Sequence, residues 1–218
     1  MGFAQTVDPT AEVIRDVALA HFARMGYEGA TMRGIAAEVG VKASSLYHYF
    51  PSKQDLLWDL AVCALDALED GWGRARAALP ASRTVHDELV AFVASHVRFH
   101  ATHSTEATLV NGHLQGLAPQ RYRSVVRRRD RYAAELVTLL TAGRDDGAFE
   151  IPDMQLTAYA ILQMGIGVAT WYRPNGPRSV DQLCAGYVAV ALKIVRPEGV
   201  ARRPIRSQGP KAQEKETG

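Results

Sequence analysis

Cysteine is almost absent from this chain. Its 218 residues include only two, Cys63 and Cys184, and neither belongs to a C-x-x-C pair. A disulfide scaffold and a zinc ribbon both need more thiols at closer spacing, so both classes are excluded. Two isolated thiols are typical of a protein kept in the reducing cytoplasm, which is where we expect this chain.

Long apolar runs are also missing. No segment approaches the roughly 20 consecutive apolar residues of a transmembrane helix. The first residues, MGFAQTVDPT, show neither the basic region nor the apolar stretch of a secretory signal. Hydrophobic residues make up 47% of the chain and charged residues 22%, which is typical of a globular protein with a sizeable core. We therefore expect no membrane partner.

The chain has no large excess of positive or negative charge. The formal net charge is +2, and residues 1–53 carry five basic and five acidic side chains. The tail from residue 196 holds six basic and three acidic groups, which leaves residues 54–195 at about −1. An interpretation in terms of nucleic acid must therefore rest on individually placed residues and not on bulk charge.

Strand-like alternation is absent over any sustained stretch, whereas helical periodicity runs through nearly the whole chain. Capping residues, glycines and prolines divide this pattern into segments. The sequence therefore predicts an all-α fold of about nine helices. A first helix starts at Asp8-Pro9 and stops at Gly26, and the others lie at about 32–39, 43–50, from 53 onward, 84–103, 105–116, 119–145, 153–172 and 179–195.

Signatures of catalysis are missing as well. The chain has no nucleophile elbow, no P-loop, no G-x-G-x-x-G after a strand and no H-E-x-x-H. We therefore expect no enzyme and no cofactor. The alternative is a helical enzyme or metal-binding protein that uses the histidines between His96 and His113.

What is present near the N-terminus is the layout of a helix-turn-helix: two short helical segments separated by Gly40-Val41. In the second segment Leu46 and Phe50 lie four residues apart and are predicted to face the core. The other side chains then point outward or sideways, and hydroxyls and rings of this kind suit base edges and phosphates in a major groove. They are Ser44, Ser45, Tyr47, His48 and Tyr49.

These residues belong to a longer pattern that resembles the DNA-binding signature of the TetR/AcrR family of bacterial regulators. The matching positions are Ala18, Phe22, Gly26-Tyr27, Thr31, Ile35-Ala36, Gly40-Val41, Leu46 to Phe50, Ser52-Lys53 and Leu56-Leu57. One departure is Gly34, which costs ~1 kcal/mol relative to alanine inside a helix. The resemblance implies a DNA-binding domain at residues 8–53 and a ligand-binding and dimerisation domain at 54–195. The polar composition of residues 196–218, with proline and glycine, predicts a disordered basic tail.

The same resemblance implies roles at DNA, position by position. Contacts with phosphates are expected from Thr31, Tyr47, Tyr49 and Lys53, and Arg33 is expected to reach a phosphate or a guanine edge. Lys42 and Ser44 stand at the start of the recognition helix, where the helix dipole favours an anion. Ser45 and His48 point most directly at base edges.

Two apolar segments near the end of the chain, 153–172 and 179–195, are expected to pair with their copies as a four-helix interface. Packing within one chain is the alternative. The residues expected at this homodimer interface are Ile161, Gly165, Val168, Trp171, Tyr172, Tyr187 and Val190.

A second, weaker resemblance lies in the stretch TWYRPNGPRSVDQLCAGYVAVAL. It is similar to the C-terminal body of TetR-family repressors that respond to acyl-CoA thioesters in fatty-acid or steroid-ring catabolism. The matching elements are Trp171-Tyr172-Arg173-Pro174, Gly176-Pro177 and Tyr187. The resemblance implies an acyl-CoA or a fatty-acid- or steroid-derived inducer, although Trp171 and Tyr172 fit a dimer interface equally well.

A ligand site is predicted from one face of the segment 84–103, where apolar and polar side chains alternate at helical spacing. An apolar stripe with a few polar groups is typical of a small-molecule pocket. The candidate residues are Phe92, His96, Phe99, His100, His103, Asn111, His113 and Met164. We favour ligand lining over a purely structural role, and both over a metal site formed by the three histidines of the segment.

Six arginines fall within eleven residues of the segment 119–145: Arg121, Arg123, Arg127, Arg128, Arg129 and Arg131. A solvated face is the favoured interpretation of such a run. Recognition of ligand phosphates is the alternative, because guanidinium groups match phosphate geometry. The resemblance to the TetR/AcrR family implies a homodimeric repressor of a palindromic operator on double-stranded DNA, released by a small-molecule inducer.

Overall fold

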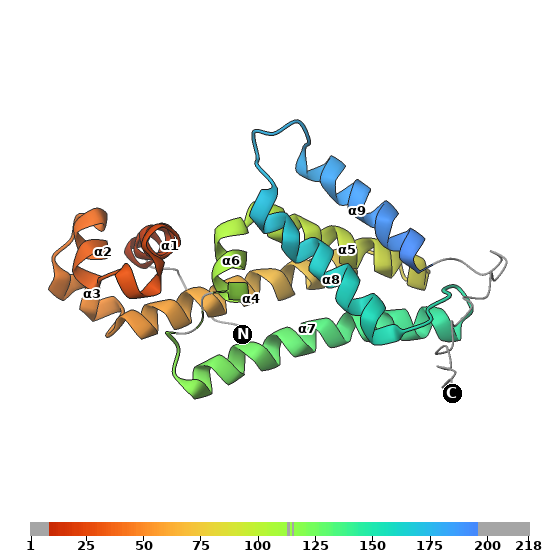
Figure 1. Ribbon diagram of the computed structural model, residues 1–218, viewed down its shortest axis with the longest axis horizontal. Coiled ribbons are helices and arrows are strands. Elements are labelled where there is room, and N and C mark those ends of the chain that lie inside the picture. The colour runs from red at the N-terminus through yellow and green to blue at the C-terminus, as the bar shows by residue number, and fades with distance from the viewer. Residues whose placement is uncertain (1–8, 113, 115, 196–218) are drawn as a thin grey trace, which may run out of the picture.

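The computed structural model describes residues 9–112, 114 and 116–195. These residues form nine helices and no strand, which confirms the all-α prediction (Figure 1). The helices are α1 (Pro9–Gly29), α2 (Met32–Val39), α3 (Ala43–Tyr49), α4 (Lys53–Ala77), α5 (Val85–Thr102), α6 (Ser104–Gly112), α7 (Pro119–Asp145), α8 (Met154–Trp171) and α9 (Val180–Ile194). In this described part, no helix is both long and apolar enough to cross a lipid bilayer. The predicted tail at 196–218 lies outside the described residues.

The helix ends follow the capping signals of the sequence. The regular helical conformation of α1 is interrupted at Gly26, whose φ is 69°. The helix then continues for a last turn to Gly29. Ser52 caps α4 by accepting a hydrogen bond from the backbone N–H of Asp55. One boundary differs: α6 ends at Gly112 instead of near residue 116, and Leu117 N–H closes a turn on Leu114 O at 3.0 Å.

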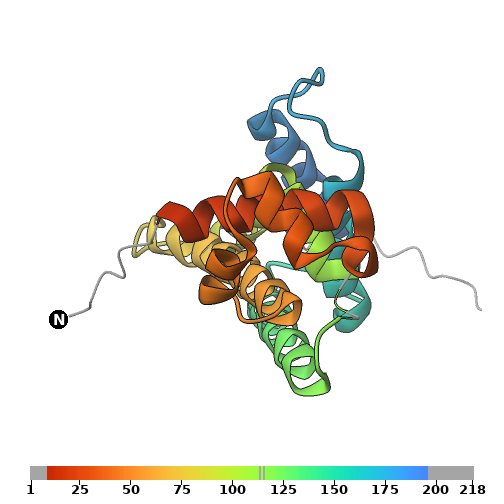
Figure 2. The same cartoon turned by 90° about the vertical axis from the view of Figure 1, so that its left-hand side faces the viewer.

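Helices α1, α2 and α3 gather at one end of the molecule, and α5, α7, α8 and α9 form the other (Figure 1). The long helix α4 runs from the first group into the second. Figure 2, viewed from the α1–α3 end, shows these three helices in front of the rest of the molecule. A single rigid helix therefore connects both ends of the molecule.

Two buried cores correspond to these two ends. The first core joins α1–α3 to the first half of α4 and to α6, and it includes Ile14, Leu46 and Leu57. The second core joins α5, α7, α8 and α9 around Phe92 and Leu136. The first core extends past residue 53, so α1–α3 pack directly on α4 and α6 and are not attached through a linker.

Candidate nucleic-acid interface and ligand pocket

Capping arrangements fix both ends of α2. Thr31 Oγ1 accepts a hydrogen bond from Gly34 N–H at 3.0 Å and so caps α2 at its start. Gly40 ends α2 with a φ of 82°, a left-handed conformation that glycine adopts without a Cβ penalty. Val41 N–H then bonds back to Ala36 O at 2.9 Å. Both helices are thereby held at a fixed angle.

Helix α3 has one buried side and one open side. Leu46 is fully buried and Phe50 nearly so. Tyr49 is half-buried and packs on the first core, with its ring edge-on to His48. The exposed side of α3 carries the remaining residues that were predicted to face DNA: Ser44, Ser45, Tyr47 and His48. An exposed aromatic and hydroxyl surface on a short, well-anchored helix is the geometry that major-groove recognition needs.

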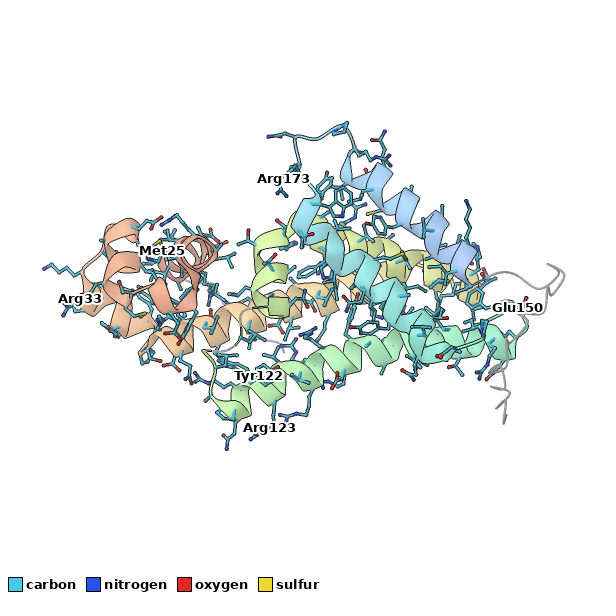
Figure 3. All side chains as sticks on the ribbon, in the orientation of Figure 1. Met25, Arg33, Tyr122, Arg123, Glu150 and Arg173 are labelled. Atoms are coloured by element: carbon cyan, nitrogen blue, oxygen red, sulfur yellow. The ribbon has the colours of Figure 1, made fainter. Side chains whose placement is uncertain are left out.

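Three basic residues flank this surface. Arg33 is exposed and extends from α2 away from the rest of the molecule (Figure 3). Lys42 is exposed and occupies the N-cap position of α3 without making a side-chain cap. Lys53 behaves differently, because its Nζ donates to Tyr27 O at 2.7 Å and to Ala30 O at 3.0 Å. Its ammonium also lies 4.3 Å from the centre of the Tyr27 ring. The phosphate contact of Lys53 remains a prediction, whereas its role in holding the end of α1 is direct.

The helix glycine that departs from the family pattern, Gly34, faces a polar brace between α1 and α2. A Cβ at this position would lie 3.3 Å from the His21 ring. His21 Nδ1 and Arg24 Nη2 both bond to the Glu38 carboxylate, at 2.9 and 2.8 Å. These two hydrogen bonds hold the pKa of Glu38 below its usual value. Glycine suits this helical position because it packs closely against His21, where an added Cβ would press on the ring.

A pocket of about 310 Å³ lies among α4, α5, α6, α7 and α8. Its walls are mostly apolar, with Leu65 and Leu68 from α4 and Phe99 from α5. Its polar side chains come from four different helices: His96, His100, Asn111, Arg129, Asp130 and Gln163. The volume falls at the lower end of the range that small-molecule sites occupy.

Two histidines and a tyrosine form the buried polar side of this pocket. His96 Nε2 bonds to Leu162 O at 3.1 Å and His96 Nδ1 to the Tyr132 hydroxyl at 3.2 Å. His100 Nδ1 bonds to His96 O at 2.8 Å. Burial lowers the pKa of His96 to about 3 and that of His100 to about 4, and it raises the pKa of Tyr132. All three groups are therefore neutral at pH 7.

The structure brings together four of the eight residues predicted at the ligand site: His96, Phe99, His100 and Asn111. Phe92 instead packs between Trp72 and Tyr132 in the second core. The ring of His103 stacks on Phe99 and lines a separate groove between α4 and α5. Met164 lines a groove toward α9, and His113 lies outside the described residues. The predicted stripe lies within an arc of about 100° on an ideal helix, but α5 packs against α4, α6, α7, α8 and α9, so its residues are divided among different neighbours.

The arginine run of α7 divides according to the partners that the fold supplies. Arg121 Nη2 bonds to Asp55 at 2.7 Å. Arg128 bonds to Glu69 through both Nε and Nη2, at 2.9 and 2.7 Å, and to Asp66 at 2.6 Å. Arg129 is the member that lines the pocket. The sequence showed the run but not its individual contacts, because these depend on how α7 packs against α4.

Among the described residues, no group of three histidine, cysteine, aspartate or glutamate side chains could hold a metal ion. Among the histidines of α5, His96 is not available as a metal ligand, because both of its ring nitrogens already have protein partners. His103 stacks on Phe99 and lines the separate groove between α4 and α5, whereas His96 and His100 line the pocket.

The predicted dimer interface contains both buried and exposed residues. Four of its seven residues are buried inside the chain: Ile161, Gly165, Val168 and Tyr172. Gly165 is buried because the His96 ring packs on it so closely that a Cβ would lie 2.2 Å from a ring carbon. These four positions are corrected from interface to core, since α5 packs against this side of α8.

The exposed side of α8 and α9 is nevertheless strongly apolar. Leu156, Tyr159, Trp171 and Val190 are 65%, 63%, 50% and 45% exposed. Trp171, Tyr187 and Val190 line a groove that also includes Met164 and Gly186. Trp171 and Val190 lie together in this groove, and exposed apolar side chains that cluster indicate an interaction surface.

Comparison with known families gives two matches along the chain. Residues 14–60 match the profile of bacterial regulatory proteins of the tetR family. Residues 82–195 match the profile described as the tetracyclin repressor-like C-terminal domain. Together they cover the helix-turn-helix and the helices that surround the pocket.

Individual relatives show the same similarity over nearly their whole length. The HTH-type transcriptional repressor KstR2 of Rhodococcus jostii is 30% identical over 179 residues, which are 81% of this chain and 86% of that protein. The solved structure of the ketosteroid transcriptional regulator KstR2 of Mycobacterium tuberculosis is 26% identical, with a TM-score of 0.79 over 89% of this chain and 98% of that one. The structure of AibR in complex with isovaleryl coenzyme A and operator DNA shares the fold, with a TM-score of 0.72 at 21% identity over 83% and 97% of the chains.

Proposed function

Because this chain belongs to the TetR family of bacterial regulatory proteins, we propose that it is a homodimeric repressor of a palindromic operator. The observation that carries the proposal is the exposed side of α3, with Tyr47 and His48 held in place by the Gly40 turn. Two copies of α3 would enter successive major grooves of the same DNA face. The division into domains at 8–53 and 54–195 and the cytoplasmic location are part of this proposal.

The side chains at DNA fall into two groups in this proposal. Ser45 and His48 read base edges, because they lie on the exposed side of the recognition helix. The remaining contacts fix the helix on the phosphates and carry no sequence information. These are Thr31, Arg33, Lys42, Ser44, Tyr47 and Tyr49.

Dimerisation would use the exposed apolar side of α8 and α9. Trp171, Tyr187 and Val190 remain in the proposed interface, with Leu156 and Tyr159 added because they are exposed on the same helix. An isologous interface of this kind sets the distance between the two recognition helices. Half-site spacing on DNA then follows from how α8 and α9 pair.

The proposed inducer is an acyl-CoA or a fatty-acid- or steroid-derived acid. Support comes from a relative named for ketosteroid regulation and from a structural neighbour bound to isovaleryl coenzyme A. A pocket of about 310 Å³ suits an acyl group and not a whole coenzyme A. The nucleotide would therefore remain outside the pocket.

Release from DNA would act through α4 and α7. Both helices line the pocket, and α4 begins at Lys53, which holds the end of α1. A ligand that fits only one position of α4 shifts the population toward that position. A preference of a few kcal/mol between the two states is sufficient to release DNA.

The test is a fluorescence-anisotropy titration of the full chain against DNA from the intergenic region upstream of its own gene. Repeating it with a panel of acyl-CoA thioesters and free acids measures release. We expect specific binding that one ligand reverses. The variant His100→Gln should keep the DNA affinity and change the ligand concentration needed for release, and an unrelated DNA fragment is the control. Absence of specific binding by a folded protein would contradict the proposal.

A further inference from the structure

The protonation pattern of the buried polar side of the pocket follows from its partners. A carbonyl oxygen only accepts hydrogen bonds, so the His96 nitrogen that meets Leu162 O carries a proton. A neutral imidazole has one such proton, so His96 Nδ1 accepts from the Tyr132 hydroxyl. By the same reasoning the Nδ1 of His100 carries its proton, because it donates to His96 O. The second nitrogen of His100, Nε2, is therefore an acceptor.

The unused hydrogen-bonding capacity at this end of the pocket is all of one kind. His100 Nε2 offers a lone pair, and within the described residues it has no hydrogen-bond partner. The Tyr132 oxygen donates its only proton to His96, so it too can only accept. Both side chains line the pocket and are buried, at 2% and 6% exposure. A ligand that enters here meets two buried acceptors and no free buried donor from this group.

The charge of the surroundings keeps these acceptors neutral. Burial lowers the pKa of His100 to about 4, and the positive charge of Arg129 acts in the same direction. Arg129 differs from Arg121 and Arg128, because no described carboxylate forms an ion pair with it. Arg129 opposes a cationic group placed beside it and does not oppose a neutral hydroxyl, while the exposed Asp130 carboxylate also lines this pocket.

We propose that the pocket selects a ligand with a hydroxyl group, which donates to His100 Nε2 or the Tyr132 oxygen, on an apolar body with an anionic or thioester end near Arg129. The inference rests on the proposed function only in taking this pocket as the inducer site. A ketone or an ether in place of the hydroxyl would set an acceptor against two buried acceptors and leave all of them unsatisfied. Selection against such analogues is strong when the site's own buried groups lose their partner.

The test uses calorimetric titration of the full chain, without DNA, with two matched acids as probes. The first is 4-(4-hydroxyphenyl)butanoate, and the second carries a methyl group in place of the hydroxyl. The methyl compound is more apolar and would bind more tightly to a pocket that does not recognise the hydroxyl. We expect the hydroxy acid to bind at least about tenfold more tightly.

Two variants identify the atoms responsible. His100→Phe and Tyr132→Phe each remove one acceptor and keep an aromatic ring, and circular dichroism checks their folding. We expect the hydroxyl preference to disappear in His100→Phe and to weaken in Tyr132→Phe. Nitrogen NMR of the wild type provides a measurement that needs no variant. The His100 Nε2 signal should be that of an unprotonated nitrogen and should shift when the hydroxy acid is added.

Several results would overturn the inference: equal or tighter binding of the methyl compound, no binding of either probe, or a preference unchanged in both variants. Its failure is distinguishable from failure of the proposed function, because DNA affinity is measured separately. A hydroxyl preference in a protein that does not bind its upstream DNA supports the pocket and refutes the repressor. Operator release by a thioester, in a protein that shows no hydroxyl preference, supports the repressor and refutes the inference about the pocket.

Discussion

The DNA-facing end and the ligand pocket are built in different ways. The α2–α3 unit is assembled from neighbours in the sequence, through the Thr31 cap, the Gly40 turn and a buried Leu46. The pocket draws its lining from five helices, and its lining residues are up to about a hundred positions apart in the sequence. Its two histidines and Tyr132 are buried, whereas the polar residues on the outer side of α3 are exposed. Stability of the fold therefore depends on the polar groups of the pocket far more than on those of the DNA-facing surface.

The largest expected effect is on the pH dependence of folding. His96 and His100 have pKa values lowered by burial to about 3 and about 4, from a usual value of 6.5. Below pH 6.5 the unfolded chain binds protons that the folded chain does not, so stability falls as the pH decreases. Between pH 7 and 5 the loss should be on the order of 2 kcal/mol for each histidine.

Urea unfolding at several pH values measures this loss. His100→Gln should show a shallower dependence, because one buried histidine is removed. His48→Ala is the control, since His48 is exposed on α3 and should leave the wild-type dependence unchanged. A free energy of unfolding that is constant between pH 7 and 5 would contradict the assignment of two neutral buried histidines.

The next effect concerns Gly165. An added Cβ would overlap the His96 ring, so Gly165→Ala should destabilise the protein by about 1–3 kcal/mol and weaken ligand binding. Gly167 on the same helix is a matched control, because a Cβ there meets nothing within 4 Å. Gly167→Ala should be neutral or stabilising, by up to about 1 kcal/mol. Thermal unfolding measures the stability of both variants. Equal stability of the two would show that the close packing of Gly165 against the His96 ring is dispensable.

Two tyrosines with the same exposure compare the DNA-facing surface with the rest of the exterior. Tyr47 on α3 and Tyr122 on α7 are each 46% exposed, and Figure 3 shows Tyr122 near the start of α7. Tyr47→Ala should lower operator affinity about tenfold or more, whereas Tyr122→Ala should not change it. Fluorescence anisotropy measures both affinities. A similar loss in both variants would remove the special role of α3.

The smallest effect should come from Lys53. Its two hydrogen bonds to carbonyls at the end of α1 predict that Lys53→Met loses about 1 kcal/mol of stability. The dependence of DNA affinity on salt should stay the same if the ammonium is used inside the protein. A salt dependence reduced by about one phosphate contact, with unchanged stability, would assign Lys53 to DNA instead.

The sequence predicted the local features of the molecule well. Helix positions follow from caps and breakers that act within one turn, and α7 begins and ends where Pro119 and Asp145 predicted. The pocket could be predicted only in part. The α5 stripe identified His96 and His100, but it could not exclude Phe92 or His103, because which side of a helix faces a pocket depends on the helices packed around it.

The same physical limit applies to α8 and α7. Ile161 and Val168 have the apolar character of an interface, and only the position of α5 shows that they are internal. Arg129 has the same chemistry as Arg128 one position earlier, and a rotation of about 100° along the helix separates an ion pair from a pocket wall. Residue type and spacing cannot distinguish such neighbours without the partner helix.

The ion pairs between α7 and α4 have a consequence for how these helices can slide past each other. Arg121 and Arg128 stand seven residues apart, about two helical turns, and both reach carboxylates of α4. A displacement of α7 by one turn would separate both arginines from their partners at once. The two sets of ion pairs therefore allow α4 and α7 to tilt together as one unit. They oppose any movement of one helix along the axis of the other.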